Sequence, residues 1–301
     1  MEFSLSTSWN AAKHNNAHSL LSEIRGAGFT SIELGFSLSK KIVEGILEIK
    51  DAAGISISSL HNMCPLPPEI EPRKASPDYY ALSSLDEGTR RMAVESARNT
   101  IDHANMLGAK AVVLHIGRVP VTDKTRLLAG TAGFPERFYL LRKEMIAERG
   151  EESPPYLENA IKSISEIIPY SKSRGVSLGI ENRYYYSEIP IPCELETIFK
   201  IFNKDDIFYW HDTGHAEVAE RLGLSSHKDV LKTFSNYLLG IHLHDIINIL
   251  DDHLPPGTGS LDFSMIKPSL KKDTIKVIEA HQPATADDIR KSAAYLSKLF
   301  G

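Results

Sequence analysis

The feature that most constrains the fold of this chain is a repeated alternation between short apolar runs and longer stretches with helical spacing. Each run has the length of a buried strand, and the stretches between them place apolar residues three and four positions apart. A strand followed by a helix, repeated eight times, predicts a parallel sheet closed into a (β/α)₈ TIM barrel. The predicted strands are residues 3–9, 31–36, 55–63, 111–117, 177–183, 207–213, 238–246 and 274–281.

Glycines mark the ends of several predicted helices and so support the same division of the chain. Gly28, Gly54, Gly108 and Gly175 each precede a predicted strand, where a helix-ending glycine is typical. The alternative fold is an open, doubly wound sheet, but no G-x-G-x-x-G motif follows the first predicted strand, which favours the barrel. The predicted helices are residues 19–27, 42–53, 89–107, 157–172, 195–202, 229–237 and 287–300.

Two segments interrupt this alternation within what otherwise reads as one domain, residues 1–301. Residues 65–77 are rich in proline and are predicted to form a loop. Residues 118–155 form a long insertion after the fourth strand, with a predicted helix at 137–149. Long insertions in compact domains are commonly functional lids, so we expect a lid over the barrel mouth. The alternative is a surface decoration or a contact between subunits of a homo-oligomer.

The composition is that of a globular protein rather than of a disordered or polyanion-binding one. Apolar residues make up 42% of the chain and charged residues 24%, and the net charge is −5. The two cysteines are far apart, which favours a reducing compartment. The first residues lack the pattern of a secretory signal, and no apolar run is long enough for a membrane helix. We therefore expect a cytoplasmic protein without membrane contact.

Six consecutive predicted strands, the third to the eighth, end in His, Asp or Glu. In a barrel these ends meet at one mouth. One such residue alone is more often a hydrogen-bonded core residue than a ligand. Six of them at one height would each be costly to bury unpaired, and a shared cation offsets that cost. The residues are His61, His115, Glu181, Asp212, His242 and Glu279.

The donor types and their spacing indicate which cation fits. Carboxylate and imidazole ligands together suit Mn, Zn, Fe or Co better than Mg or Ca, and we expect Mn, Zn or Co as the cofactor. Asp212 and His215 are three residues apart across a strand-to-helix turn and can face one site. His242 and His244 lie on one strand face, so alternation does not decide which of them binds. Two more possible ligands lie in the next loop, where a polar turn is the alternative: Asp251 and His253.

Taken in this order, the motifs resemble those of the xylose-isomerase-like TIM-barrel superfamily, over nearly the whole chain. The superfamily includes sugar (phosphate) isomerases and epimerases and the endonuclease IV family of DNA repair. The motifs are Ile-Glu-Asn at 180–182, Asp-Thr-Gly-His at 212–215, His-Leu-His-Asp at 242–245, and Asp-x-His-Leu-Pro-Pro-Gly-x-Gly at 251–259, with Asp-Phe at 262–263.

The resemblance to the ketose epimerases implies one metal ion and two catalytic glutamates. The matching ligands are Glu181, Asp212, His242 and Glu279, and the two glutamates would act as the acid/base pair. His242 is preferred to His244 because an acid, Asp245, lies three residues after it. This implies an isomerase or epimerase of a sugar, sugar phosphate, sugar acid or polyol that works through a metal-stabilised enediolate. The residues expected to hold the carbohydrate substrate are His244, Arg183 and Tyr184, with His215 also able to contact its hydroxyls.

The resemblance to endonuclease IV implies a different activity, the cleavage of DNA at abasic sites by three zinc ions. All nine ligands of that family have counterparts here: His61, His115, Glu181, Asp212, His215, His242, Asp251, His253 and Glu279. Three departures count against it. The segment between 242 and 251 is short, Asn-Met-Cys-Pro at 62–65 stands where that family has a Ser-Tyr segment, and the acidic chain lacks the basic stripe that tracks phosphates. The epimerases usually carry an arginine after the motif at 242–245, and here Ile-Ile-Asn follows. A barrel that binds without turnover is the third hypothesis.

Overall fold

The computed structural model describes residues 2–301, with the backbone alone described for Asp251, and over these residues the chain forms one closed barrel. Eight strands pair side by side in parallel, and the last pairs with the first, so the predicted (β/α)₈ fold is confirmed. The barrel strands are β1 (Ser4–Ser6), β2 (Ser31–Leu34), β3 (Ser56–His61), β4 (Ala111–Leu114), β5 (Ser177–Glu181), β6 (Phe208–Asp212), β7 (Leu238–Leu243) and β10 (Ile275–Ile278).

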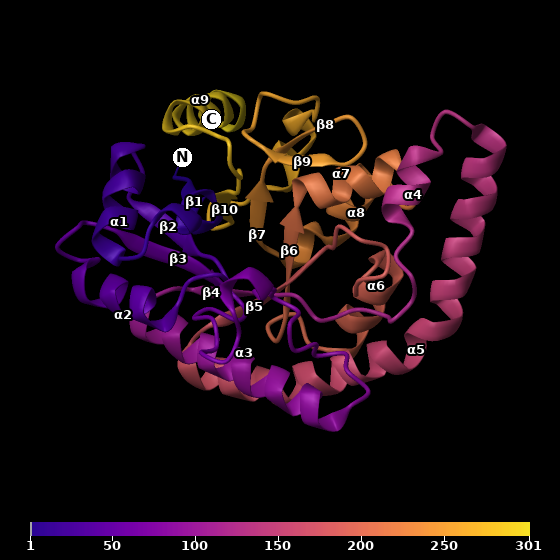
Figure 1. Cartoon of the computed structure of the whole chain (residues 1–301), viewed down its shortest axis with the longest axis horizontal. Coiled ribbons are helices and arrows are strands. Elements are labelled where there is room, and N and C mark those ends of the chain that lie inside the picture. Colours follow the sequence, from indigo (N-terminus) through magenta and orange to yellow (C-terminus); the bar gives the residue numbers. More distant parts are fainter. Residues whose placement is uncertain (1) are drawn as a thin grey trace.

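Helices surround the barrel, and the two chain termini lie close together beside it (Figure 1). The α-helices are α1 (Ala17–Gly26), α2 (Lys40–Ile49), α3 (Glu87–Leu107), α4 (Thr125–Gly130), α5 (Pro135–Arg174), α6 (Pro192–Ile201), α7 (Thr213–Arg221), α8 (His227–Phe234) and α9 (Ala286–Phe300). Short 3₁₀ turns are η1 (Thr7–Trp9), η2 (Ala11–Lys13), η3 (Pro72–Lys74), η4 (Ser235–Tyr237), η5 (Phe263–Met265) and η6 (Lys267–Ser269). Among the described helices, none combines the length and the apolar character needed to cross a bilayer.

Local signals in the sequence explain where many helices begin and end. Asp86 caps α3, because its side chain accepts a hydrogen bond from the backbone N–H of Thr89 at 2.8 Å. The four glycines predicted to end helices, at 28, 54, 108 and 175, all have φ between +61° and +92°. Glycine adopts this left-handed conformation most readily, and Gly108 and Gly175 are the C-caps of α3 and α5 as predicted. Gly28 and Gly54 lie in the turns that follow α1 and α2.

The barrel interior is built in layers, as the two-residue period of a strand requires. Ala111, Val113, Trp210 and Val277 pack together as one apolar cluster inside the barrel. Trp210 is the largest of them, and a Cβ at Gly240 of β7 would collide with its ring. The next inward layer, two residues further along each strand, is the one that carries the polar side chains at the mouth.

Several predicted strands are shorter than expected at their carboxyl ends. The predicted strand 238–246 leaves the barrel after Leu243 and continues into a hairpin of β8 (Asp245–Ile247) and β9 (Asp251–Leu254). The predicted strand 3–9 stops at Ser6, and η1 follows it.

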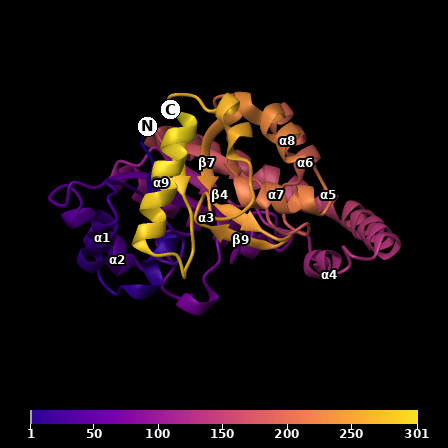
Figure 2. The ribbon, with the colours of Figure 1, turned by 90° about the horizontal axis from the view of Figure 1, so that it is seen from above.

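The segment 118–155 differs most from its prediction. The helices expected at 137–149 and 157–172 are one helix, α5, with Pro154 and Pro155 inside it. Each proline removes a backbone donor and favours a bend, and Figure 1 shows α5 bending rather than breaking. Its first part projects past the barrel with α4 beside it, as Figure 2 also shows from above. The insertion is therefore largely an extension of a barrel helix, and α4 contributes Arg126 to the rim of the mouth.

Candidate metal centre

The mouth of the barrel gathers the side chains that end the strands. Asp212 lies two residues beyond Trp210, and Glu279 two beyond Val277, so each carboxylate sits directly above the apolar layer. All six strand-end residues predicted from the sequence are buried at this level. The structure therefore brings together His61, His115, Glu181, Asp212, His242 and Glu279.

A central group of four side chains has the geometry of a metal site. Ligand atoms of Glu181, Asp212, His242 and Glu279 all lie within 4.8 Å of one another. His242 Nδ1 is 2.7 Å from Glu181 Oε1, 3.0 Å from Glu279 Oε2 and 3.6 Å from Asp212 Oδ2. Three carboxylates converging on one imidazole nitrogen form a donor set that fits a divalent cation such as Mn, Zn or Co.

A buried carboxylate that the sequence analysis did not single out, Glu33 of β2, lies on the other side of the same imidazole. Its Oε1 is 3.0 Å from His242 Nε2, and its Oε2 accepts a hydrogen bond from Ser59 Oγ at 2.7 Å. If a cation replaces the proton on Nδ1, the proton kept on Nε2 can still be donated to Glu33. A glutamate inside the apolar predicted strand 31–36 is the sequence signal for it, but Glu33 lies in the second strand and not at the end of the third to eighth strands.

The electrostatics of the central group are dominated by its own charges. Burial alone would raise the pKa of Glu181, but His115 and His242 beside it hold that pKa well below its usual range. Asp212 likewise has a lowered pKa, because His215 and His244 outweigh its burial. Burial alone would lower the pKa of His242, but Glu279, Glu33 and Glu181 raise it well above its usual value. The imidazole thus carries the positive charge that a bound cation would replace.

A second group next to the first joins His61 and His115 to Glu181. The ring of His61 stacks on His242 with centroids 5.3 Å apart, and its Nδ1 has no hydrogen-bond partner among the described residues. Burial lowers the pKa of His61 to about 4, so this imidazole is neutral at pH 7. Arg183 occupies the same region, because its guanidinium contacts both His115 Nε2 and Glu181 Oε2.

Arg183 and Tyr184, expected to hold substrate, both lie on the wall of the mouth cavity. The guanidinium of Arg183 is already paired, at 2.8 Å from Glu188 Oε1 and 3.5 Å from Asp78 Oδ2. Asp78 comes from the loop after β3, is buried, and was not anticipated from the sequence. The hydroxyl of Tyr184 donates to the carbonyl of Leu250 at 3.0 Å. Arg183 therefore serves first to neutralise its acidic neighbours.

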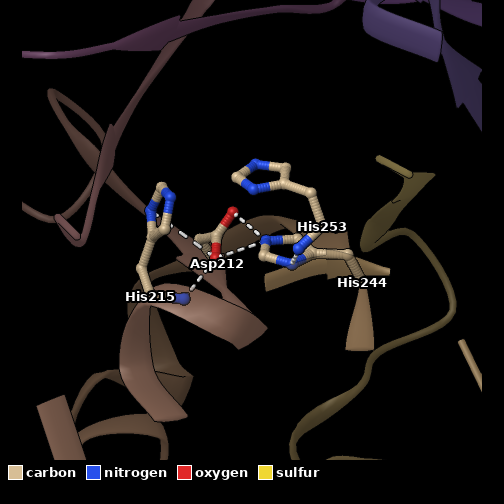
Figure 3. A group of neighbouring side chains, drawn as sticks. All are labelled: Asp212, His215, His244 and His253. Atoms are coloured by element: carbon tan, nitrogen blue, oxygen red, sulfur yellow. Dashed lines mark hydrogen bonds and ion pairs between the residues drawn. The ribbon is translucent and has the colours of Figure 1, made fainter. Parts of the chain in front are cut away.

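A third group surrounds Asp212 from the side of α7 and of the β8–β9 hairpin. It contains Asp212, His215, His244 and His253, and Figure 3 shows the three imidazoles arranged around the carboxylate. The backbone N–H of His215 donates to Asp212 Oδ1 at 2.8 Å, and His253 Nδ1 lies 2.9 Å from Asp252 Oδ2. Asp251 was predicted as a possible ligand, but its side chain lies outside the part of the chain that the structure describes.

The cavity above these groups has a volume of about 720 Å³ and is open to solvent. Six of the predicted site residues line it, together with His281, which follows β10: His61, His115, Glu181, His215, His253 and Glu279. His244 does not reach the cavity. It is fully buried and bonded to Asp212, so the structure places it behind the site rather than on the substrate wall.

Comparison with known proteins places this barrel in a family. The model of xylose isomerase-like TIM barrels matches residues 21–299. An uncharacterised protein of Sinorhizobium fredii, y4fM, is 27% identical over 255 residues, which cover 81% of this chain and 73% of the relative.

Two solved structures show how closely the fold is shared. A D-tagatose 3-epimerase-like protein superposes with a TM-score of 0.72 at 21% identity, covering 99% of this chain and 97% of its own. The IolI protein with a bound zinc atom gives a TM-score of 0.67 at 14% identity, covering 100% and 98%. At these identities the likeness concerns the fold. From the match over residues 21–299, the chain belongs to the xylose isomerase-like TIM-barrel family.

Proposed function

We propose that this protein is a divalent-metal-dependent isomerase or epimerase acting on a sugar or a closely related sugar acid, sugar phosphate or polyol. The observation that carries the proposal is the central group of Glu181, Asp212, His242 and Glu279, whose ligand atoms converge within 4.8 Å beneath an open cavity. Sugar epimerases among the proteins with this fold support the same reaction class. The zinc atom bound by IolI supports the choice of a metal.

The four central residues would hold the ion, and two of them would also handle protons. A divalent cation bound there would polarise a substrate carbonyl and so acidify the adjacent carbon. Glu181 and Glu279 both face the cavity, from β5 and β10, on strands separated by β6 and β7. One carboxylate can take a proton from the substrate carbon while the other returns one from a different direction. This pairing suits epimerisation, or isomerisation across neighbouring carbons.

The surroundings of the pair favour a polyhydroxylated substrate. His215, His253 and His281 give one wall of the cavity several imidazole donors and acceptors. Arg183 holds Glu181 Oε2 in place at 3.3 Å, which leaves Oε1 directed at the central group. Ser8 Oγ donates to Glu279 Oε1 at 3.4 Å and restrains the second carboxylate. Both carboxylates are thus oriented before substrate enters.

Solvent deuterium incorporation tests the proposed reaction directly. The purified protein, loaded with Mn, Co or Zn, is incubated in D₂O with a panel of ketoses, sugar acids and sugar phosphates. Deuterium should enter the carbon beside the carbonyl, and the product should be an isomer or epimer. Glu181→Gln should abolish this exchange, whereas the surface variant Glu196→Gln, on α6, should retain it. Absence of exchange and conversion with every sugar would refute the proposed reaction.

A second candidate function is metal-dependent hydrolysis of DNA at abasic sites. It is favoured by one observation, the presence of two further ligand groups that share Glu181 and Asp212 with the central group. Two or three ions in such adjoining sites could activate water and stabilise a leaving oxygen. Incision of abasic DNA by zinc-loaded protein, combined with two or three zinc ions per chain, would establish this function instead.

A further inference from the structure

His244 follows β7 and lies against Asp212 with both of its ring nitrogens engaged. Its Nε2 is 2.8 Å from Asp212 Oδ1 and 2.9 Å from Asp212 Oδ2. Its Nδ1 accepts a hydrogen bond from the backbone N–H of His253 at 2.9 Å. Figure 3 shows the ring of His244 directed at the carboxylate.

These two contacts fix the position of the proton on the ring. A backbone N–H can only donate, so Nδ1 of His244 must present its lone pair to His253. The ring proton therefore sits on Nε2 and points at both oxygens of Asp212. In this form Nε2 has no lone pair for a metal ion, although it lies near the other donor atoms of the group. A neutral imidazole donor also leaves the negative charge of Asp212 intact for a cation.

Packing holds the ring of His244 in this orientation. A Cβ at Gly214 would collide with the ring, so the glycine of the Asp-Thr-Gly-His motif makes the space that the ring fills. Thr213 Oγ1 accepts the backbone N–H of His244 at 3.1 Å and donates to its carbonyl at 2.8 Å. The ring of His253 stacks on that of His244, with centroids 4.0 Å apart and planes 7° apart. The ring is therefore confined on several sides.

The contacts of Asp212 show what this confinement achieves. Its Oδ1 accepts the backbone N–H of His215 at 2.8 Å as well as the proton of His244. Its Oδ2 faces the central group, 3.6 Å from His242 Nδ1. With one donor bridging both oxygens and a second on Oδ1, the carboxylate plane is set, and Oδ2 is directed at the place where the ion would bind.

We infer that His244 is a positioning residue that orients Asp212 and binds neither metal nor substrate itself. The inference rests on the proposed function in one respect, namely that Asp212 is a metal ligand. It also links the β8–β9 hairpin to the site, because the backbone of His253 orients His244, and His244 orients Asp212.

Two substitutions separate the functions of the two ring nitrogens. Gln places an amide N–H close to the position of Nε2 and keeps the donor to Asp212. Asn places an amide oxygen close to the position of Nδ1 and keeps the acceptor for His253. The probe is Zn²⁺ alone, with its affinity measured by competition against a chelating dye. We expect His244→Gln to stay within about threefold of the wild type and His244→Asn to lose about 10- to 100-fold.

Each other pattern would overturn the inference. Large losses in both variants would make His244 a metal ligand. A loss in His244→Gln alone would make it an anchor for the hairpin. Wild-type affinity in both would mean that the ring does not position Asp212.

The tautomer can be tested without metal, which separates this inference from the proposed function. Nitrogen NMR of metal-free protein with ¹⁵N-labelled histidine should show His244 protonated at Nε2 and not at Nδ1, its signal being identified by its loss in His244→Gln. A proton on Nδ1 would refute the inference. If the wild type bound no metal but showed the expected tautomer, the proposed function would fail and the contact between His244 and Asp212 would stand.

Discussion

At the scale of the residue, the site is a concentration of negative charge around one imidazole. Four buried carboxylates lie within hydrogen-bond or ion-pair distance of His242: Glu33, Glu181, Asp212 and Glu279. Burying charge without compensation is costly, and His242 together with Arg183, which also pairs with Glu188, does not balance four carboxylates. A divalent cation in the central group would restore the balance, and this is the physical reason for expecting tight metal binding there.

Neutralising either member of the proposed acid/base pair should stop turnover without unfolding the chain. For Glu181→Gln and Glu279→Gln we expect kcat to fall by about 10²–10⁴, because an amide cannot accept the substrate proton. The melting temperature should fall somewhat, because the lowered pKa of each carboxylate shows that neighbouring histidines stabilise its charged form in the fold. Steady-state kinetics and thermal unfolding measure the two effects, and near-normal kcat in either folded variant would remove that residue from the mechanism.

Glu33 should affect the metal rather than the substrate, because it holds His242 from the side opposite the central group. Replacing its carboxylate by an amide in Glu33→Gln weakens the hold on the Nε2 proton and should lower metal affinity about tenfold. Glu196→Gln, the same chemical change at an exposed glutamate of α6, is the matched control. Unchanged affinity in Glu33→Gln would show that His242 needs no such partner.

At the scale of the element, the site depends on how β6 passes into α7. Asp212 is both the last residue of β6 and the N-cap of α7, so one side chain ends a strand and begins a helix. The following Gly214 then brings the helix close to the ring of His244. Asp-Thr-Gly-His was recognisable in the sequence as a motif, but α7 was not predicted, because this short helix begins without a break after the strand.

A methyl group at position 214 should therefore disturb both stability and metal binding. In Gly214→Ala the new Cβ would overlap the ring of His244, which has no free space to move into. We expect a destabilisation of about 1–3 kcal/mol and a loss of metal affinity. Gly26→Ala, in α1, meets nothing within 4 Å and should be neutral or slightly stabilising. Chemical denaturation checks both, and equal behaviour of the two variants would contradict the packing described here.

The parts of the site that the sequence predicted are those that follow from strand periodicity. Glu181, Asp212, His242 and Glu279 end strands, and a closed parallel barrel brings all such ends to one rim. Residues whose positions depend on tertiary packing were missed or placed differently. Asp78 reaches the site from an irregular loop, and His244 is held behind the site by a backbone contact that no spacing rule reveals.

At the scale of the whole molecule, the strands form a regular barrel, and the features that differ from a simple (β/α)₈ fold lie in its long connections. Residues 118–155 and the β8–β9 hairpin both approach the mouth, through Arg126 and His253 respectively. Two helices were predicted at 137–149 and 157–172, but α5 continues through Pro154 and Pro155, and its later turns are fixed by buried residues such as Ile164 and Ile167. Periodicity predicts which faces are buried, but not whether packing will bridge such an interruption.

Metal should stabilise the entire barrel, because the ligands come from β5, β6, β7 and β10 and must be assembled to bind it. At a free metal concentration of about 100 times Kd, the stabilisation is about 2.7 kcal/mol, which corresponds to a rise of roughly 5 °C in melting temperature. Thermal unfolding of chelator-treated protein, with and without added Mn²⁺ or Zn²⁺, measures this shift. Identical melting temperatures would show that the ion does not bind the folded state.

The most direct test of the central claim is the metal content per chain, determined by elemental analysis of the purified protein after reconstitution and removal of free ions. We predict about one divalent ion per wild-type chain, and none in Glu181→Ala or Asp212→Ala, because both remove ligands of the central group. A wild-type chain without bound metal, or full occupancy in both variants, would contradict a metal centre at these residues.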